Sequence, residues 1–139
     1  PPAPKPVAAY VPAVRSGALV YVSGQIPMRD GAPIATGTVP GAVSVETALE
    51  CARQCALNGL AVLRQEIGDL ALVRRVVRLG CFVASEPGFT GQPSIANGAS
   101  ELMLEVFGEA GRHARAAVGS VALPLGVPVE IEFLFEVGT

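Results

Sequence analysis

Residues 44–84 read SVETALECARQCALNGLAVLRQEIGDLALVRRVVRLGCFVA, and this stretch decides the fold class. Its first part carries apolar residues at helical spacing, namely Leu49, Ala52, Ala56, Leu60, Leu63 and Ile67. Ser44 can cap the start of this helix, and Gly68 can end it. The last part, from residue 72 to residue 84, is rich in valine, which favours a strand. The stretch therefore predicts a helix over residues 45–67 followed by a long strand.

Similar elements flank this stretch on both sides. They are a β-hairpin formed by residues 10–15 and 19–23, a glycine- and proline-rich loop over 24–41, a second loop over 86–93, a helix over about 94–107 ended by Gly108, and a closing hairpin formed by 114–123 and 127–137. The order β-β-α-β-α-β-β predicts a single α+β domain over residues 1–139, with one mixed sheet covered by two helices on one face. Residues 1–9, which begin PPAPKP, are expected to form an extended, proline-stiffened arm.

The predicted strands carry more apolar surface than two helices can cover. In the last strand Val129, Ile131, Phe133 and Phe135 share one side, with mainly glutamates on the other. The strand over 72–84 is apolar on both sides, with Val73, Val77, Leu79, Cys81 and Val83 facing one way and Val76, Phe82 and Ala84 the other. Because only one face can pack on the helices, the second face predicts a partner, most simply in a symmetric homo-oligomer.

Composition excludes several classes of function. Apolar residues make up 50% of the chain, but charged residues interrupt every apolar run, so no stretch reaches the roughly 18 residues of a membrane span. The net charge is −2 and no basic block is present, which disfavours a nucleic-acid partner and a ribonuclease role. The visible start shows no signal pattern, so we expect a soluble protein.

The three cysteines indicate a reducing compartment. Cys51, Cys55 and Cys81 are odd in number and lie within the apolar pattern, so we expect buried free thiols and not a disulfide framework. The single histidine, His113, lies far from them in the sequence, and no zinc spacing is met. His113 is most simply an ordinary residue at a strand end. These features fit a cytoplasmic protein.

Several short motifs occur together in a recognisable order. They are Tyr10-Val11, Ser23-Gly24-Gln25-Ile26-Pro27, Ala114-Arg115, Leu123-Pro124 and Val129-Glu130-Ile131-Glu132. Over nearly its whole length the chain thereby resembles the YjgF/RidA family of reactive-intermediate deaminases, also labelled L-PSP endoribonucleases. The resemblance implies a chorismate-mutase-like fold that forms homotrimers with clefts between subunits. It also implies hydrolysis of small 2-imino or enamine acids to 2-keto acids and ammonia, as in 2-iminobutanoate/2-iminopropanoate deaminases, with no metal or cofactor.

Two residues match the family's catalytic positions. Arg115 matches the arginine that grips the substrate carboxylate, a task suited to the planar, bidentate guanidinium group. Glu130 matches the acid that orients or activates the attacking water, which a carboxylate in a partly dry cleft can do. Without the resemblance, Arg115 is equally well a surface arginine in a strand, and Glu130 an exposed glutamate beside Glu132.

Five further residues match positions that line the family's cleft. Tyr10 and Ser23 carry hydroxyl groups that can bond substrate or water, Gly24 allows close approach of a ligand, and Asn97 corresponds to a cleft asparagine. Ala117 stands where deaminase members usually carry cysteine, so backbone contacts can persist there and a thiol contact cannot. An edge aromatic and a strand-end serine are the ordinary alternatives for Tyr10 and Ser23.

Three functions are therefore in competition. Arg115 together with Glu130 favours imine hydrolysis, whereas Ala117 favours a non-catalytic module that binds a small carboxylate such as a keto acid. A holdase-like role ranks last, because the sequence offers no flexible apolar tail. The partners implied are the small acid and further copies of this chain, with no nucleic acid and no membrane.

Overall fold

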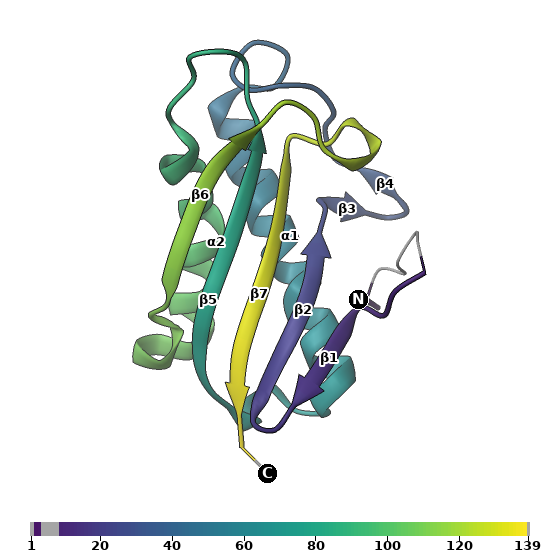
Figure 1. Ribbon diagram of the computed structural model, residues 1–139, viewed down its shortest axis with the longest axis vertical. Coiled ribbons are helices and arrows are strands. Elements are labelled where there is room, and N and C mark those ends of the chain that lie inside the picture. Colours follow the sequence, from purple (N-terminus) through teal and green to yellow (C-terminus); the bar gives the residue numbers. More distant parts are fainter. Residues whose placement is uncertain (1, 4–8, 139) are drawn as a thin grey trace.

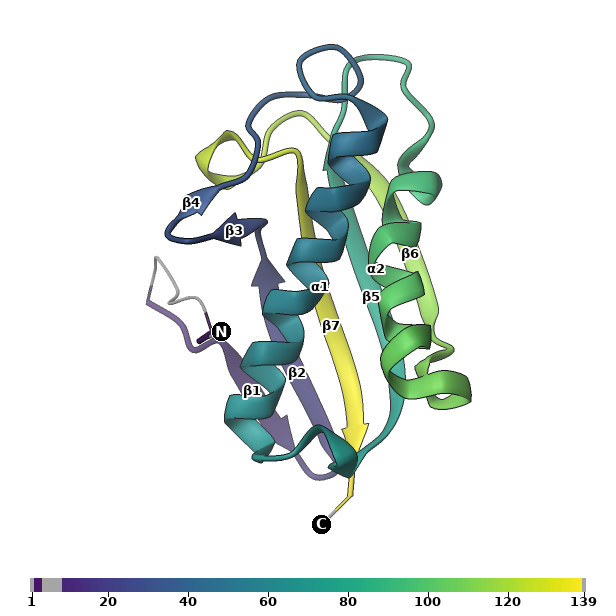
Figure 2. The same cartoon turned by 180° about the vertical axis from the view of Figure 1, so that it is seen from behind.

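The computed structural model describes residues 2–3 and 9–138, and it consists of one five-stranded sheet with two helices on one face (Figures 1 and 2). The sheet strands are β1 (Ala13–Ser16), β2 (Leu19–Gln25), β5 (Val73–Ala84), β6 (Ala114–Ser120) and β7 (Val129–Val137), in the order β1-β2-β7-β5-β6. The helices are α1 (Val45–Ile67) and α2 (Gln92–Phe107). The predicted α+β class, with two helices on one face of a mixed sheet, is confirmed.

Helix α1 has the bounds that its caps predict. The Ser44 hydroxyl accepts a hydrogen bond from the backbone N–H of Thr47 at 3.1 Å, and Gly68 ends the helix with φ 91°. The side of α1 near β7 is closely packed: a Cβ on Gly59 would overlap the ring of Phe133. Helix α2 begins at Gln92, slightly before the predicted start, with Pro93 in its first turn.

The glycine- and proline-rich loop contains a small two-stranded ribbon that the sequence did not predict. Its strands are β3 (Met28–Arg29) and β4 (Ala32–Pro33), which pair antiparallel. Asn58 on α1 donates hydrogen bonds from Nδ2 to the backbone oxygens of Ile26 and Met28, both at 3.1 Å. These bonds attach the ribbon to α1, and Figure 2 shows the two elements on the same side of the molecule.

The predicted closing hairpin is wrong. Strand β6 pairs parallel with β5, and β7 lies between β2 and β5, so β6 and β7 are not neighbours (Figure 1). The segment after Ser120 carries the chain across the end of the sheet, with positive φ at Leu125 and Gly126. Pairing depends on burial here: β7 buries large side chains and takes the centre, whereas the small residues of β6 suit an edge.

Strand faces follow the predicted alternation in β7 but not throughout β5. In β7 the side chains of Val129, Ile131, Phe133, Phe135 and Val137 are all buried, as predicted. In β5 a bulge lies between Val76 and Arg78, so Val76 pairs with Phe135 and is fully buried on the helix side. The prediction that Val77 shares a face with Leu79 is wrong, because the extra residue shifts the alternation by one position.

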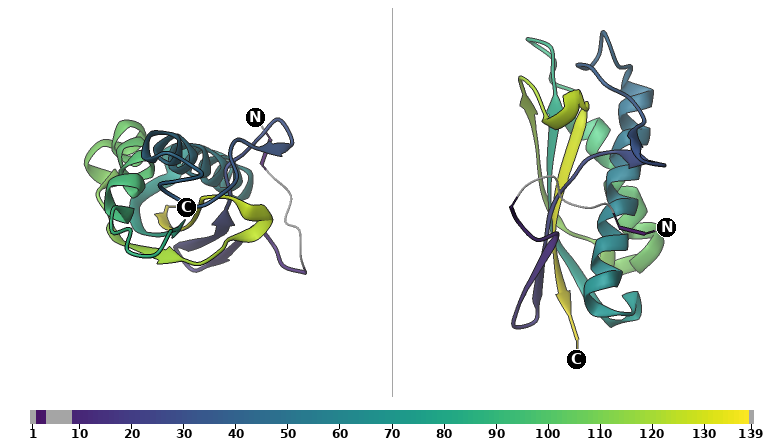
Figure 3. Two further views of the ribbon diagram at one scale, coloured as in Figure 1. Left: turned by 90° about the horizontal axis from the view of Figure 1, so that it is seen from above. Right: turned by 90° about the vertical axis from the view of Figure 1, so that its right-hand side faces the viewer.

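The face of the sheet away from the helices is uncovered in the single chain, as the side view in Figure 3 shows. About half of each of Val14, Tyr21 and Val118 is exposed (51%, 50% and 48%). Arg78 and Glu132 form an ion pair of 2.9 Å on the same face. The second face is therefore a mixture of apolar and charged side chains, less uniformly apolar than the sequence predicted.

The N-terminal segment is described only in part. Of the predicted arm over residues 1–9, residues 1 and 4–8 lie outside the described part, while Pro2 and Ala3 line a groove with residues of α1. Among the described residues, no helix is long and apolar enough to cross a membrane.

The three cysteines are buried and free, as predicted. Burial raises the pKa of Cys51 to about 11 and that of Cys81 to about 12. Burial likewise raises the pKa of Cys55 well above its ordinary value. Each thiol is therefore both inaccessible and almost wholly protonated at neutral pH, which removes the reactive thiolate.

We expect native protein to react with a thiol reagent such as dithiobis-nitrobenzoate at least about 100-fold more slowly than protein unfolded in guanidinium, because reaction requires opening of the core. The measurement is absorbance of the released thiolate with time, with the unfolded protein as the control that counts all three thiols. Rapid labelling of any cysteine in folded protein would contradict this assignment.

Candidate functional site

A β-bulge in β2 shapes the first part of the candidate site. Val22 pairs with Phe133 and Gln25 with Ile131, so Ser23 and Gly24 together lie opposite the one residue between those partners. The Ser23 hydroxyl donates to the backbone oxygen of Val11 at 2.9 Å, and its N–H donates to that of Pro12 at 2.9 Å. These bonds attach the segment that follows Tyr10 to the bulge.

Glu130 lies over this bulge, on the uncovered face of the sheet. It pairs with Phe82 of β5 and alternates with the buried side chains of β7. A Cβ on Gly24 would overlap the Glu130 carboxyl group, so a larger residue here would displace the carboxylate from this place. Partial burial, and secondarily the charge of Glu132, raise the pKa of Glu130 above its usual value. We call Tyr10, Ser23, Gly24 and Glu130 the outer-face cluster.

Arg115 lies on the opposite face of the sheet, toward the helices. It pairs with Leu79 of β5, whose side chain is buried under them. Its NH1 group donates to Asn97 Oδ1 at 2.8 Å and to Ser100 Oγ at 3.1 Å, both on α2. Ala117 is two residues further along β6 and packs against the core on the same side. We call Asn97, Arg115 and Ala117 the edge cluster.

The structure thus divides the seven predicted site residues into two groups. The outer-face cluster belongs to β2, β7 and the segment before β1, and the edge cluster belongs to β6 and α2, with β5 between β7 and β6. The clusters also lie on opposite faces of the sheet. One chain therefore does not bring Arg115 and Glu130 together around a single ligand, and a joint site needs a second copy.

Sequence reasoning missed two polar neighbours of Arg115. Ser100 Oγ lies 2.8 Å from His113 Nε2, and His113 Nδ1 lies 2.6 Å from the backbone oxygen of Gly111. The sequence alone favours an ordinary strand-end role for His113 and assigns no role to Ser100. A signal existed: Ser100 follows Asn97 by one helical turn, and His113 precedes Arg115 by two residues at the start of a strand.

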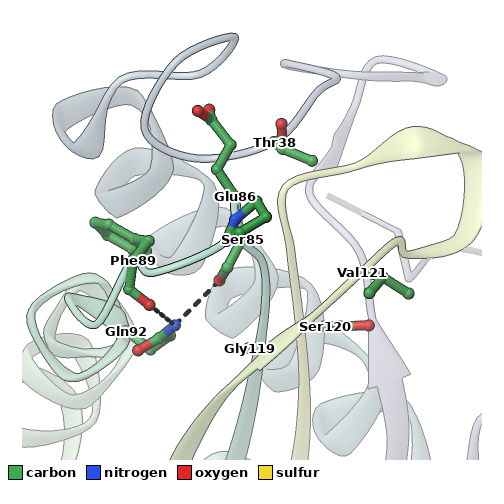
Figure 4. Close-up of a pocket in the computed structure, with 9 residues that line it drawn as sticks. Thr38, Ser85, Glu86, Phe89, Gln92, Gly119, Ser120 and Val121 are labelled. Atoms are coloured by element: carbon green, nitrogen blue, oxygen red, sulfur yellow. Dashed lines mark hydrogen bonds between the residues drawn. The ribbon is translucent and has the colours of Figure 1, made fainter.

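A hollow that the sequence does not predict lies at the ends of β5 and β6 (Figure 4). Its volume is about 540 Å³, and its lining includes Thr38, Ser85, Glu86, Phe89, Gln92 and Gly119. Gln92 Nε2 donates to Ser85 Oγ at 3.1 Å and to the Phe89 backbone oxygen at 2.8 Å. Gly119 lies on β6 two residues beyond Ala117, on the same side, so this hollow continues the line of the edge cluster.

The arrangement of two helices on one sheet is that of chorismate-mutase-like proteins of the YjgF group. The model of the YjgF/chorismate mutase-like endoribonuclease family matches residues 3–136, so the chain belongs to this family. The chain is similar to Protein TCP17 of Trypanosoma cruzi, with 46% identity over 137 residues that cover 98% of this chain and 86% of that protein.

Solved structures agree with this assignment. The protein Atu1372 from Agrobacterium tumefaciens, of unknown function, matches with a TM-score of 0.93 and 48% identity over 97% of this chain and 87% of that one. A protein from Shewanella oneidensis, described as a possible endoribonuclease, matches with a TM-score of 0.95 and 28% identity over 99% and 91% of the two chains.

The raised pKa of Glu130 gives a prediction about stability. A group whose pKa is higher in the folded than in the unfolded state favours folding below the unfolded pKa and loses that contribution as pH rises through the folded pKa. We therefore expect Glu130→Gln to raise the melting temperature at about pH 7.5 and to have a smaller effect at about pH 4, where the carboxyl group is protonated.

The control for this comparison is Glu132→Gln, which removes a carboxylate that is paired with Arg78 and should not stabilise the fold. The measurement is thermal unfolding followed by circular dichroism at both pH values. A lower melting temperature for Glu130→Gln at neutral pH would show that the ionised carboxylate is favourable in the folded state.

Proposed function

We propose that this protein hydrolyses small 2-imino or enamine acids to 2-keto acids and ammonia, in clefts between the subunits of a homotrimer. The observation that supports this proposal most directly is the hydrogen bonding of the Arg115 guanidinium group. Its NH1 group is bonded to α2, and the described residues offer its Nε and NH2 groups no hydrogen bond and no carboxylate partner. A guanidinium group oriented in this way presents one free edge, which suits bidentate binding of a carboxylate.

Glu130 supplies the second group that the reaction needs. In the proposed cleft, Glu130 of a neighbouring subunit accepts a proton from water as the water oxygen attacks C2 of the imine. The imine reacts in its protonated form, so addition of water gives a neutral carbinolamine. Its amine nitrogen takes up the proton held by Glu130 and the C–N bond breaks. The hydroxyl proton passes back to Glu130 and on to the departing ammonia as the C2 oxygen becomes the keto group. A raised pKa supports this role, because a base is most effective when its pKa lies near the working pH.

The separation of the predicted site residues into two clusters on opposite faces of the sheet supports the proposed homotrimer. Joining the edge cluster of one subunit to the outer-face cluster of another would assemble all seven residues and would cover the half-exposed side chains of Val14, Tyr21 and Val118. The free, buried cysteines suit a reducing compartment, and we propose the cytoplasm.

A non-catalytic module that binds a small keto acid is the second candidate. Ala117 favours it, since this position has no thiol to contact the ligand. An endoribonuclease role has less support, because the net charge is −2 and the chain has a single histidine. Generating 2-aminoacrylate or bulkier imines with an amino-acid dehydratase or oxidase, and following their decay with and without this protein, separates turnover from binding.

The trimer can be tested by changing the uncovered face. We expect wild-type protein at micromolar concentration to scatter light as a trimer, and Tyr21→Glu to be a folded monomer that no longer binds pyruvate, because a buried charge opposes the interface. Leu57→Glu is the control: it places an equal charge on a side chain of α1, which is 41% exposed on the helix side. A wild-type monomer that binds pyruvate would contradict the shared site.

The roles of the two catalytic candidates can be separated by calorimetry with pyruvate or 2-oxobutyrate. We expect Arg115→Ala to lose about 1.5–3 kcal/mol, or roughly 10- to 150-fold in affinity, because a charge-assisted bidentate contact is removed. Arg115→Lys should recover part of this loss. Glu130→Gln should keep binding and lose turnover in the imine assay, since the amide cannot act as a base.

Pyruvate affinity of Arg115→Ala equal to that of the wild type would refute the carboxylate site. If the wild type binds keto acids but accelerates the decay of no imine, the binding module is the correct function.

A further inference from the structure

The groups behind Arg115 form a chain of hydrogen bonds, and we assign the bond directions for a neutral His113 ring. The Gly111 backbone oxygen can only accept, so His113 Nδ1, at 2.6 Å, carries the proton and donates it. His113 Nε2 is then the acceptor of the neutral ring, and the Ser100 hydroxyl donates to it at 2.8 Å. With its proton directed to His113, the Ser100 oxygen accepts from Arg115 NH1 at 3.1 Å.

This chain controls how Arg115 is presented. NH1 has two N–H groups, and the two acceptors, Asn97 Oδ1 and Ser100 Oγ, lie one helical turn apart on α2. Two acceptors on one nitrogen define the plane of the guanidinium group as well as its position. Arg115 is therefore held by one end, with the edge formed by Nε and NH2 left for a ligand.

His113 is needed because a serine in the middle of a helix has a competing partner. Such a hydroxyl commonly donates to the backbone oxygen four residues earlier, which for Ser100 is that of Ala96. His113 offers a stronger acceptor on the other side, toward β6. The imidazole thus orients the Ser100 oxygen lone pairs toward Arg115, and the Gly111 oxygen in turn fixes the imidazole tautomer.

We propose that Ser100 and His113 are positioning residues of the carboxylate site, which hold the Arg115 guanidinium group in the orientation that binds a planar carboxylate. This inference rests on the proposed function and adds to it two residues that do not touch the ligand. They share a hollow with Arg115 and Arg112, and its lining contains no carboxylate. Within the described part of the chain, the ion pair found at this place joins Arg112 to Glu109 at 3.7 Å and does not involve Arg115.

The same pair does not form a nucleophile with its base. The Ser100 oxygen already accepts a hydrogen bond from the Arg115 guanidinium group, which withdraws electron density from the atom that would attack. Its location in the middle of α2 also provides no free backbone N–H groups to stabilise an oxyanion, since those of an interior turn are bonded within the helix. Positioning is the role that these contacts support.

The test measures pyruvate binding by calorimetry in four variants and a control. We expect Ser100→Ala and His113→Ala each to weaken binding about 5- to 10-fold, and the double variant to be no weaker than the worse single one, because the residues act as one chain. Ser100→Thr, which keeps the hydroxyl group, should bind within about twofold of the wild type. Ser94→Ala, at an exposed serine of the same helix, should have no effect.

A second readout does not depend on the ligand. The Arg115 Nε–H resonance, assigned by its loss in Arg115→Ala, should be sharp in wild type and Ser100→Thr, and broadened in Ser100→Ala and His113→Ala. Melting temperatures confirm that each variant is folded. Wild-type affinity and a sharp resonance in Ser100→Ala would overturn the positioning role, as would equal losses in Ser100→Ala and Ser100→Thr.

The two proposals fail in different ways. If Arg115→Ala binds pyruvate as well as the wild type, the carboxylate site is wrong, whatever Ser100 does. If Arg115→Ala loses binding while Ser100→Ala and His113→Ala do not, the carboxylate site stands and the positioning role is refuted.

Discussion

Burial of one side of β7 beneath the two helices is the constraint on which the rest of the structure depends. Phe135 stacks with Phe133 at 6.0 Å and meets Phe107 of α2 edge-on at 6.5 Å, so this strand joins the sheet to the helix layer. Each such side chain contributes about 1.5–3 kcal/mol by leaving water. Strand pleating then requires Glu130, next to buried residues, to face the other way, onto the face that the proposed homotrimer would cover.

The edge position of β6 follows from the same constraint. With β7 in the centre, β6 can pair only with the free side of β5, and the parallel register directs Arg115 toward α2. The two halves of the site are thus built by different local means, a bulge with a glycine for Glu130 and a helix face for Arg115. In the proposed homotrimer, neither half would have to adjust when the other half comes from another chain.

Local features could be predicted from the sequence and pairing could not. The bounds of α1 follow from Ser44 and Gly68, which act on the backbone beside them. The bulge near Val76, and the choice of β5 over β7 as partner of β6, depend on residues distant in sequence, so alternation alone gave the wrong face and the wrong hairpin. For the same reason Arg115 could be matched through the Ala114-Arg115 motif, whereas the contact of Ser100 with His113 depends on the packing of α2 on β6.

If the proposed carboxylate site is correct, the side of β6 toward α2 bears on the size of the ligand. Beyond Arg115 its next two residues are Ala117 and Gly119, which offer a methyl group and a hydrogen atom. A ligand with its carboxylate at Arg115 would therefore meet little side-chain volume from this strand as it extends toward the hollow at Gly119. The length of such a ligand would be limited by the opposite side of the hollow, where Gln92 donates hydrogen bonds to Ser85 and to the Phe89 backbone oxygen. Under the proposed function, substrate selection would therefore fall to α2 and the loop before it, and water activation to the opposite face of the sheet.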